Sequence, residues 1–194
     1  MKTLMIAPEV FLAEGGIARI LRAYLHALPR CETTSSKHQI GLIVMNDTRA
    51  SLENMPRYLR EQGLYPLVTC SGSKLRFILA CLWHGFFADR ILCGHLHLSP
   101  IPRFLKRLRS RLNYYIIAHG IEVWRPYSTR EKQALLHASN VFCVSDYSKN
   151  QIRYHLPEID HQRLTVVPNT LDPDFALPKN PETRQGNDDL RILS

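Results

Sequence analysis

The sequence predicts an α/β fold in which a doubly wound, mainly parallel sheet carries helices on both faces. Two observations lead to this fold class. Seven short apolar runs of strand length alternate with segments whose apolar residues recur at helical spacing, as they do where crossover helices join parallel strands. Runs such as residues 40–45 (IGLIVM) are apolar throughout, which is typical of strands that helices cover on both faces. At 194 residues, the chain is expected to form a single folded domain.

The first unit is a strand at 3–7, a loop that closes on Gly15 and Gly16, and a helix at 17–28. One apolar stripe at i, i+3, i+4, i+7, i+8 and i+11 predicts the helix. Two adjacent glycines let the backbone come close to a ligand, and the first N–H groups of a helix lack partners, so this end attracts phosphate or sugar oxygens. A tight turn without a ligand is the alternative. The spacing is not GxGxxG, so a dinucleotide fingerprint is not supported.

Six further strands are expected at 40–45, 65–70, 90–93, 114–118, 141–144 and 164–167. The helices between them are expected at 49–62, 73–87, 101–112, 128–139 and 147–155. Gly63 is placed to end the first of these, and the helix at 73–87 carries enough apolar residues to be largely buried. Ser128 or Thr129 is expected to cap the helix that follows it, and Ser145 to cap the last. The Pro, Asn, Asp and Gly content of 173–189 indicates a linker.

The segment at 99–112 forms a basic amphipathic helix on a helical wheel. Its apolar residues gather within about 100°, and they are Ile101, Phe104, Leu105, Leu108 and Leu112. The cations on the other side are Arg103, Lys106, Arg107, Arg109 and Arg111. No acidic residue lies between Asp89 and Glu122. The helix either packs its leucines on the sheet as an ordinary surface helix, or it also contacts anionic lipid headgroups or an anionic substrate.

The composition indicates which kind of binding partner and which cellular compartment to expect. The 25 Lys+Arg against 17 Asp+Glu give a net charge of +8, which favours an anionic partner. The five cysteines are odd in number and widely spaced, so reduced, buried thiols are expected rather than disulfides or a zinc site. The chain has no signal-peptide core and no run of about 18 apolar residues. We therefore expect a cytoplasmic protein, with peripheral contact at the inner face of the membrane as an open alternative.

Polar side chains follow several strands at the edge where the carboxyl ends meet, which is where doubly wound sheets bind ligands. His119 follows a strand directly and precedes Gly120, with Glu122 three residues on, and we interpret His119 as functional rather than structural. His95 and His97 would share one face of a strand, but no third ligand accompanies them. A structural or pocket-wall role is therefore favoured over a metal site. No GxSxG, Walker or HExxH motif is present.

Four motifs together resemble a known family. They are EGG at 14–16, AHGIEVW at 118–124, CVSDYSKNQI at 143–152 and VVPNTLDPDF at 166–175. In this order and spacing, the chain resembles the N-terminal half of a retaining glycosyltransferase of family 4, an enzyme of the GT-B fold. The resemblance implies a Rossmann-like, acceptor-side domain at 1–172, the linker at 173–189, and the start of a truncated second domain at 190–194.

The resemblance also implies roles for the residues at the first two motifs. Gly15 and Gly16 would lie against the donor phosphates and the acceptor. His119, the candidate catalytic residue, would face the donor sugar in the cleft. Glu122 stands beside it as a candidate for donor or acceptor binding.

The last two motifs supply three more candidates for donor or acceptor binding. Ser145 would match the serine that opens the family's S-x-x-S/T helix, although helix capping alone also explains a serine there. Asn169 and Asp172 would match the PN-x-x-D turn that leads to the linker. This chain has Thr170 where the family usually has glycine, which puts the geometry of that turn in question.

The implied function is transfer of a sugar from a nucleotide-sugar donor to a glycan or lipid-linked acceptor with retention of configuration, without a metal or another cofactor. The nucleotide pocket would lie largely in the second domain, so this domain alone is expected to be inactive. Two alternatives stay open. One is a basic, non-catalytic module for nucleic acid or a phosphorylated partner; no aromatic residues interleave with the cations to stack bases, so nucleic acid is not expected. The other is a nucleotide-sugar epimerase-like enzyme, against which the missing GxGxxG speaks.

Overall fold

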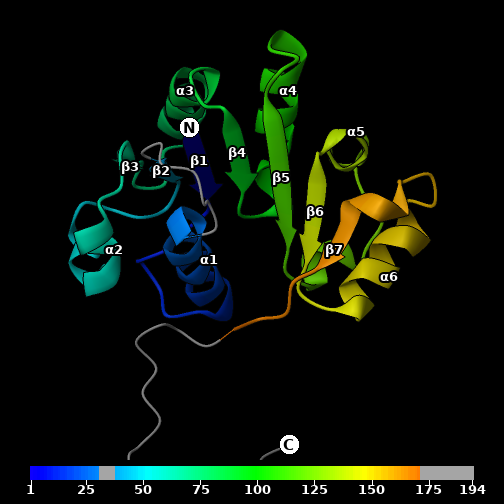
Figure 1. Ribbon diagram of the computed structural model, residues 1–194, viewed down its shortest axis with the longest axis horizontal. Coiled ribbons are helices and arrows are strands. Elements are labelled where there is room, and N and C mark those ends of the chain that lie inside the picture. Colours follow the sequence, from blue (N-terminus) through cyan, green and yellow to red (C-terminus); the bar gives the residue numbers. More distant parts are fainter. Residues whose placement is uncertain (31–37, 171–194) are drawn as a thin grey trace, which may run out of the picture.

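The computed structural model describes residues 1–30 and 38–170, and these form a seven-stranded sheet in which every neighbouring pair is parallel (Figure 1). The strands are β1 (Lys2–Ala7), β2 (Gln39–Val44), β3 (Leu67–Thr69), β4 (Arg90–Cys93), β5 (Asn113–Ala118), β6 (Asn140–Cys143) and β7 (Leu164–Val166). They lie in the order β3-β2-β1-β4-β5-β6-β7. The chain thus winds outward from β1 to one edge and from β4 to the other, which confirms the predicted doubly wound sheet.

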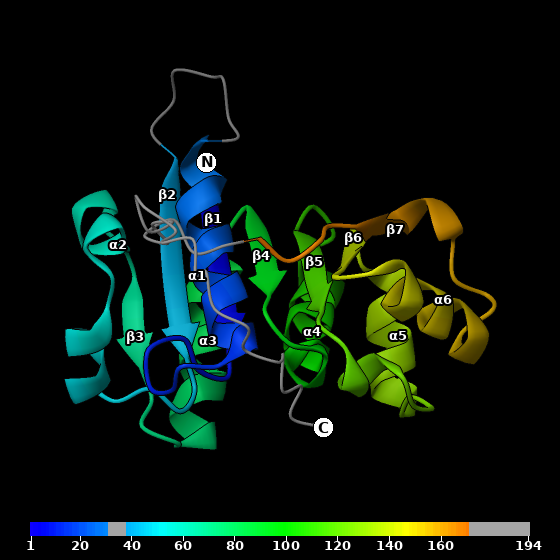
Figure 2. The same ribbon diagram turned by 90° about the horizontal axis from the view of Figure 1, so that it is seen from below.

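Helices cover both faces of the sheet. They are α1 (Gly16–Ala27), α2 (Arg57–Gln62), α3 (Lys74–Phe86), α4 (Pro100–Leu108), α5 (Thr129–His137) and α6 (Asp146–His155). Leu21 of α1 and Leu59 of α2 belong to the core on one face, whereas Phe77 of α3 and Ile152 of α6 belong to the core on the other. Figure 2 shows α3, α4, α5 and α6 along one side of the sheet. Residues 173–194, with the expected linker and second domain, lie outside the described residues.

Two predicted helix boundaries are wrong. The helix expected at 49–62 is split into a 3-10 turn (Ala50–Asn54) and α2, because Pro56 has no N–H to donate and forces Met55 into an extended conformation with ψ of 125°. The helix expected at 101–112 ends at Leu108. The next strand begins at Asn113, so the intervening residues must turn the chain back toward the sheet. Leu112 is nevertheless fully buried.

The expectation that the helix at 73–87 is largely buried is also wrong. Only one stripe of α3 is buried, formed by Phe77, Cys81 and Gly85. Trp83 is 68% exposed and Leu79 57% exposed. The sheet covers one side of α3 and α4 packs along another, so the remaining apolar residues face solvent.

The expectation of free, buried thiols holds for the cysteines that the structure describes, since Cys70, Cys81, Cys93 and Cys143 are free and buried.

The carboxyl ends of the strands lie level at one edge. Backbone hydrogen bonds continue past the ladders there, from Met45 to Ala7, from Gly94 to Ile6, from Val144 to Ala118 and from Val167 to Cys143. Gly94 is required by close packing, because a Cβ at this position would lie 2.9 Å from Leu21 Cδ2 and 3.1 Å from Ile6 O. The loops that follow β1, β4, β5 and β6 therefore gather at the lower edge of the sheet in Figure 1.

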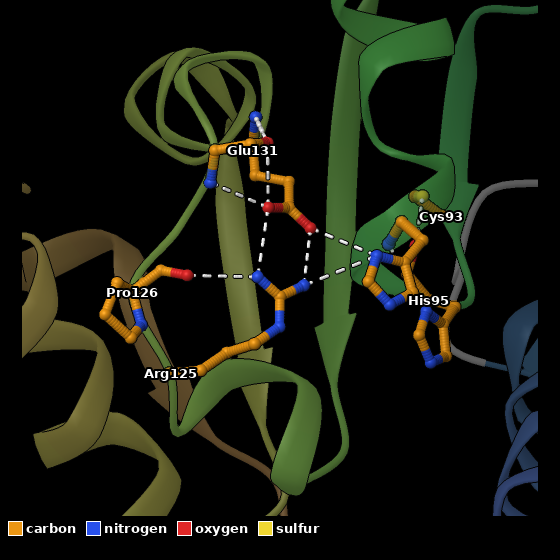
Figure 3. A network of polar contacts seen from close by, with 7 residues as sticks. Cys93, His95, Arg125, Pro126 and Glu131 are labelled. Carbon is orange, nitrogen blue, oxygen red and sulfur yellow. Dashed lines mark hydrogen bonds and ion pairs between the residues drawn. The ribbon is translucent and has the colours of Figure 1, made fainter.

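The buried carboxylate of Glu131 joins three segments beside this edge, namely the start of α5, the loop after β5 and the 3-10 turn after β4. Ser128 and Glu131 form a reciprocal capping box at the start of α5, which confirms the predicted cap. Arg125 donates to both oxygens of Glu131, over 2.8 and 3.2 Å (Figure 3). Nδ1 of His97 lies 3.1 Å from Oε1 of Glu131. Burial alone raises the pKa of Glu131, but the hydrogen bonds from Arg125 and Ser128 outweigh it and lower the pKa from 4.5 to about 2.

This pKa gives the stability of the domain a dependence on pH. A carboxyl that is more acidic in the folded state stabilises it above the unfolded pKa, and this stabilisation is lost as the pH falls toward the folded pKa. We predict that Glu131→Gln, which keeps the cap but removes the charge, lowers the free energy of unfolding by about 2 kcal/mol at neutral pH. The difference from wild type should narrow as the pH falls from 4.5 toward 2. Urea unfolding across this range measures it.

Glu61→Gln is the matched control, since Glu61 also accepts from an arginine, at 2.7 Å from Arg57, but both side chains are exposed. Its effect should stay within about 0.5 kcal/mol at every pH. A loss in Glu131→Gln that is the same at acid and neutral pH would contradict the prediction.

Candidate functional site

His119 is held at the carboxyl edge by a hydrogen bond from its imidazole ring. It follows β5 directly, is 9% exposed, and its Nε2 lies 2.9 Å from the carbonyl oxygen of Gly94. Because a carbonyl can only accept, Nε2 carries the proton and Nδ1 is left as an acceptor. Burial lowers the pKa of His119 below its ordinary 6.5, against the effects of the Gly94 carbonyl and of Glu122. Nδ1 is buried and has no hydrogen-bond partner among the described residues.

Glu122 fixes the loop that carries this histidine. One carboxylate oxygen accepts from the backbone N–H of His119 at 2.6 Å, and the other accepts from the N–H of Gly120 at 3.0 Å. The side chain is buried, with 6% exposed. In this arrangement Glu122 faces its own loop, so it positions His119. Its predicted contact with donor or acceptor stays a prediction.

The sequence led us to expect His95 and His97 on one face of a strand, but neither residue lies in a strand. They lie at the 3-10 turn that follows β4, where the N–H of His97 donates to Nδ1 of His95 at 3.3 Å. The two rings stack at 4.9 Å between centroids, and the ring of His95 lies 6.4 Å from that of His119. His97 points to Glu131, as described above. Within 1–30 and 38–170, no three His, Cys, Asp or Glu side chains form a group that could hold a metal.

The loop between β1 and α1 is held by two charged groups that the sequence analysis did not single out. The buried carboxylate of Asp47 accepts from the N–H groups of Val10, Phe11 and Leu12 at 3.0 to 3.3 Å. At the other end of the loop, the buried Arg22 donates to both oxygens of Glu14, at 3.1 and 2.9 Å. The hydrogen bond from Arg22 lowers the pKa of Glu14. The backbone of the loop is therefore fixed from both ends.

Gly15 and Gly16 begin α1 in open space. Gly15 is the N-cap, with an extended backbone and no side-chain cap, and a Cβ at either position would meet no atom within 4 Å. Packing within this domain therefore does not require glycine at either position. Both are exposed, so the first N–H groups of the helix face a region that a ligand can enter.

Within the part of the chain that it describes, the structure gives the remaining strand-end candidates no contact that points to a ligand. Ser145 caps α6 by accepting from the N–H of Ser148 at 3.2 Å, as expected of a structural serine. Trp124 Nε1 donates to Ser148 Oγ at 3.3 Å and its ring packs edge-on against Tyr147. Asn169 is exposed just beyond β7. Asp172 lies outside the described residues.

The five cations of α4 and the turn after it lie apart from the strand-end residues. Arg107 and Arg111 are exposed, whereas Arg103 is half-buried. Lys106 donates to the carbonyl of Ser110, and Arg109 donates to the carbonyls of Phe86 and Ala88, at 2.6 Å in each case. The structure therefore does not bring this set together with His119 or the glycine loop.

One signal in the sequence could have found Asp47. It stands just after a strand at the carboxyl edge, the same position that drew attention to His119. Arg22 gave a second signal, because it is a cation beside the apolar stripe of α1 and eight residues from an acid, Glu14. The contact of Arg125 with Glu131 had no such signal, since it depends on how the loop after β5 folds back on α5.

Comparisons with known proteins agree with this arrangement. The family model for Glycosyltransferase Family 4 matches residues 14–175. No curated protein matches the chain. Among solved structures, the chain is similar to lipopolysaccharide outer core galactosyltransferase WaaB in its apo form, with a TM-score of 0.57 and 15% identity over 88% of this chain and 46% of that one.

Two further structures have the same likeness in fold. Anabaena Alr3699/HepE in complex with UDP gives a TM-score of 0.59 at 15% identity, over 88% of this chain and 44% of that one. UDP-GlcNAc 2-epimerase from Neisseria meningitidis, bound to UDP-GlcNAc, gives a TM-score of 0.55 at 11% identity, over 88% of this chain and 46% of that one. The chain thus spans less than half the length of each of these structures.

The fold is accordingly the N-terminal, Rossmann-like domain of the GT-B fold, as these structures share it. The epimerase shows that the fold alone does not separate two activities. The family model matches a range that includes the glycine loop, His119, Ser145 and Asn169. The chain belongs to Glycosyltransferase Family 4.

Proposed function

We propose that this chain is the acceptor-side domain of a hexosyltransferase, which moves a sugar from a nucleotide-sugar donor to a glycan or lipid-linked acceptor with retention of configuration. In this proposal, residues 1–172 form the domain, 173–189 a linker, and 190–194 the start of a second domain. The observation that carries it is the imidazole of His119, held at the carboxyl edge with Nδ1 unpaired among the described residues. Family membership supports it.

The chemistry of the reaction fits the groups at this edge. Transfer breaks the bond between the sugar and the diphosphate, and negative charge grows on the leaving oxygen. The open start of α1 at Gly15 and Gly16 offers unpaired N–H groups and the positive end of the helix dipole to that diphosphate. Nδ1 of His119 is an acceptor in the neutral ring, and because it is buried, a hydroxyl of the donor sugar reaches it only when the side chain or its loop moves. Ser145, Asn169, Asp172 and Glu122 stay as candidates for further donor or acceptor contacts.

The extent of the chain supports a site shared between two domains. The chain covers 46% of the WaaB structure and 44% of the HepE structure, and other HepE structures are complexes with UDP and glucose and with UDP-glucose. We infer a donor of that class here, a nucleotide-sugar. Two domains that close on donor and acceptor hold them in register and exclude water. One domain alone is therefore proposed to be inactive.

The length and activity of the native gene product test the proposal together. Mass spectrometry is expected to give a product about twice as long as this chain, given the 46% coverage. That product should hydrolyse or transfer from one of a panel of nucleotide-sugars, while the 194-residue chain does not. The anomeric configuration of the product, read by NMR, should equal that of the donor. Inversion would overturn retention, and no turnover of any donor would overturn the proposal.

We predict that His119→Gln lowers kcat/KM of the native product by tenfold to about a hundredfold. The glutamine amide can still donate to the carbonyl of Gly94, but its acceptor oxygen does not lie in the position of Nδ1. The proposed hydrogen bond to the sugar is then lost, and a lost hydrogen bond to a buried group has about this cost. The thermal midpoint should change little. His137→Gln on the exposed surface of α5 is the control and should leave both quantities unchanged. Unaltered kinetics in His119→Gln would refute a role for Nδ1.

Two glycines allow donor binding to be separated from stability. Gly16→Ala should leave the thermal midpoint unchanged or raised, because its Cβ meets nothing and alanine favours the helix. It should raise KM for the donor, since the Cβ enters the space proposed for the diphosphate. Gly94→Ala should instead lower the thermal midpoint, because its Cβ meets Leu21 and Ile6. If Gly16→Ala leaves KM unchanged, the glycine loop does not contact the donor.

A further inference from the structure

We propose that the outer surface of α3 and α4 docks on an anionic lipid bilayer, with the apolar side chains entering the headgroup region. The surface, called here the apolar ridge, consists of Leu79, Trp83, Phe86, Phe87, Phe104 and Leu108. It is separate from the strand-end site. The proposal does not depend on the transfer reaction proposed above.

The apolar ridge is exposed although its residues are large. Trp83 is 68% exposed, Leu108 60% and Phe87 57%. The ring of Phe87 packs edge-on against those of Trp83 and Phe86, at 5.8 and 5.5 Å between centroids, so the aromatic group is already assembled. A contiguous apolar surface of this kind is costly in water and marks a contact site in soluble proteins.

The apolar ridge is one surface because the two helices lie close together. Figure 1 shows α3 and α4 side by side. At their contact, a Cβ on Gly85 would lie only 2.6 Å from Leu105 Cδ1, so the missing side chain lets the helices approach. The ridge residues line a hollow of about 500 Å³ between the two helices. Its apolar lining suits acyl chains or the upper part of a lipid tail.

Charge complementarity selects the occupant. Residues 62–121 contain eight Lys and Arg but only one acid, Asp89, and Asp89 accepts from the backbone N–H of Lys2 at 2.8 Å. Arg107 and Arg111 lie exposed on or just after α4, close in sequence to Phe104 and Leu108 of the ridge. Exposed aromatic residues flanked by cations are the pattern of surfaces that lie in the interface of an anionic membrane.

Two other interpretations fit less well. A nucleic acid would pair with the cations, but the rings of Trp83, Phe86 and Phe87 pack edge-on against one another and do not form a row of parallel faces on which successive bases stack. Spanning the bilayer is not required, and none of the helices that the structure describes combines the length and apolar character needed to cross one. The surface therefore contacts the bilayer from one side.

The contact also leaves the candidate site open. Each helix runs back from the carboxyl edge of the parallel sheet to the opposite edge, so Trp83, Phe86 and Phe87 lie toward the far end of α3. His119 and the glycine loop lie at the carboxyl edge. A bilayer against the apolar ridge thus does not cover the loops at that edge.

Flotation with lipid vesicles tests the proposal on this chain. The chain is expected to float with phosphatidylcholine vesicles that contain phosphatidylglycerol, and to float at least about tenfold less with phosphatidylcholine alone or at high salt. Trp83→Ser combined with Arg107→Gln should reduce flotation by at least about tenfold. Tyr154→Ser combined with Arg153→Gln on α6 is the matched control, since both residues are exposed there, and it should float like wild type.

Fluorescence locates the contact. The chain has two tryptophans, Trp83 and Trp124, so Trp124→Phe leaves Trp83 as the reporter and Trp83→Phe leaves Trp124. The emission of Trp83 should shift to the blue and be quenched by brominated lipid, and the emission of Trp124 should not. Equal flotation of both double variants, or quenching of Trp124 alone, would overturn the proposal. Dimerisation without lipid that Trp83→Ser abolishes would overturn it in favour of a second copy as the occupant.

Discussion

The parallel sheet imposes one constraint on everything at its carboxyl edge. All strands end together there, and the loops that follow must find partners for their backbone N–H groups without a further strand to pair with. Three buried carboxylates meet this need. Asp47 accepts from the loop after β1, Glu122 from the loop after β5, and Glu131 from the turn before α5. Hydrogen bonds from N–H groups and cations to such anions are strong when both partners are held, so the loops keep one conformation.

Most of the fold could be predicted from local pattern, and most of what could not depends on contacts between distant segments. The seven strands were found because each is an apolar run bounded by polar loops. The exposure of α3 was missed, because periodicity shows which residues are apolar but does not count the helices available to cover them. The break at Pro56 has a simpler cause, because proline has no N–H to donate and holds Met55 in an extended conformation, which helical spacing alone does not show.

The candidate site shows the same division. Position after a strand was enough to single out His119, and it would have sufficed for Asp47. The direction of Glu122 was not predictable, because whether its carboxylate faces a ligand or its own backbone depends on the turn after β5. The likeness to a UDP-GlcNAc 2-epimerase at nearly the same TM-score as to WaaB shows why the fold cannot decide the activity. The residues in the loops carry that information.

Gly94 lies between the two loops that carry the candidate ligand residues. Leu21 of α1 packs directly over the bare Cα of Gly94, and the carbonyl of the same residue accepts from His119. The packing of α1 on the sheet and the hydrogen bond that places a proton on Nε2 of His119 therefore meet at one residue. A side chain at position 94 would push against Leu21 and against the backbone of Ile6, so one substitution would disturb both.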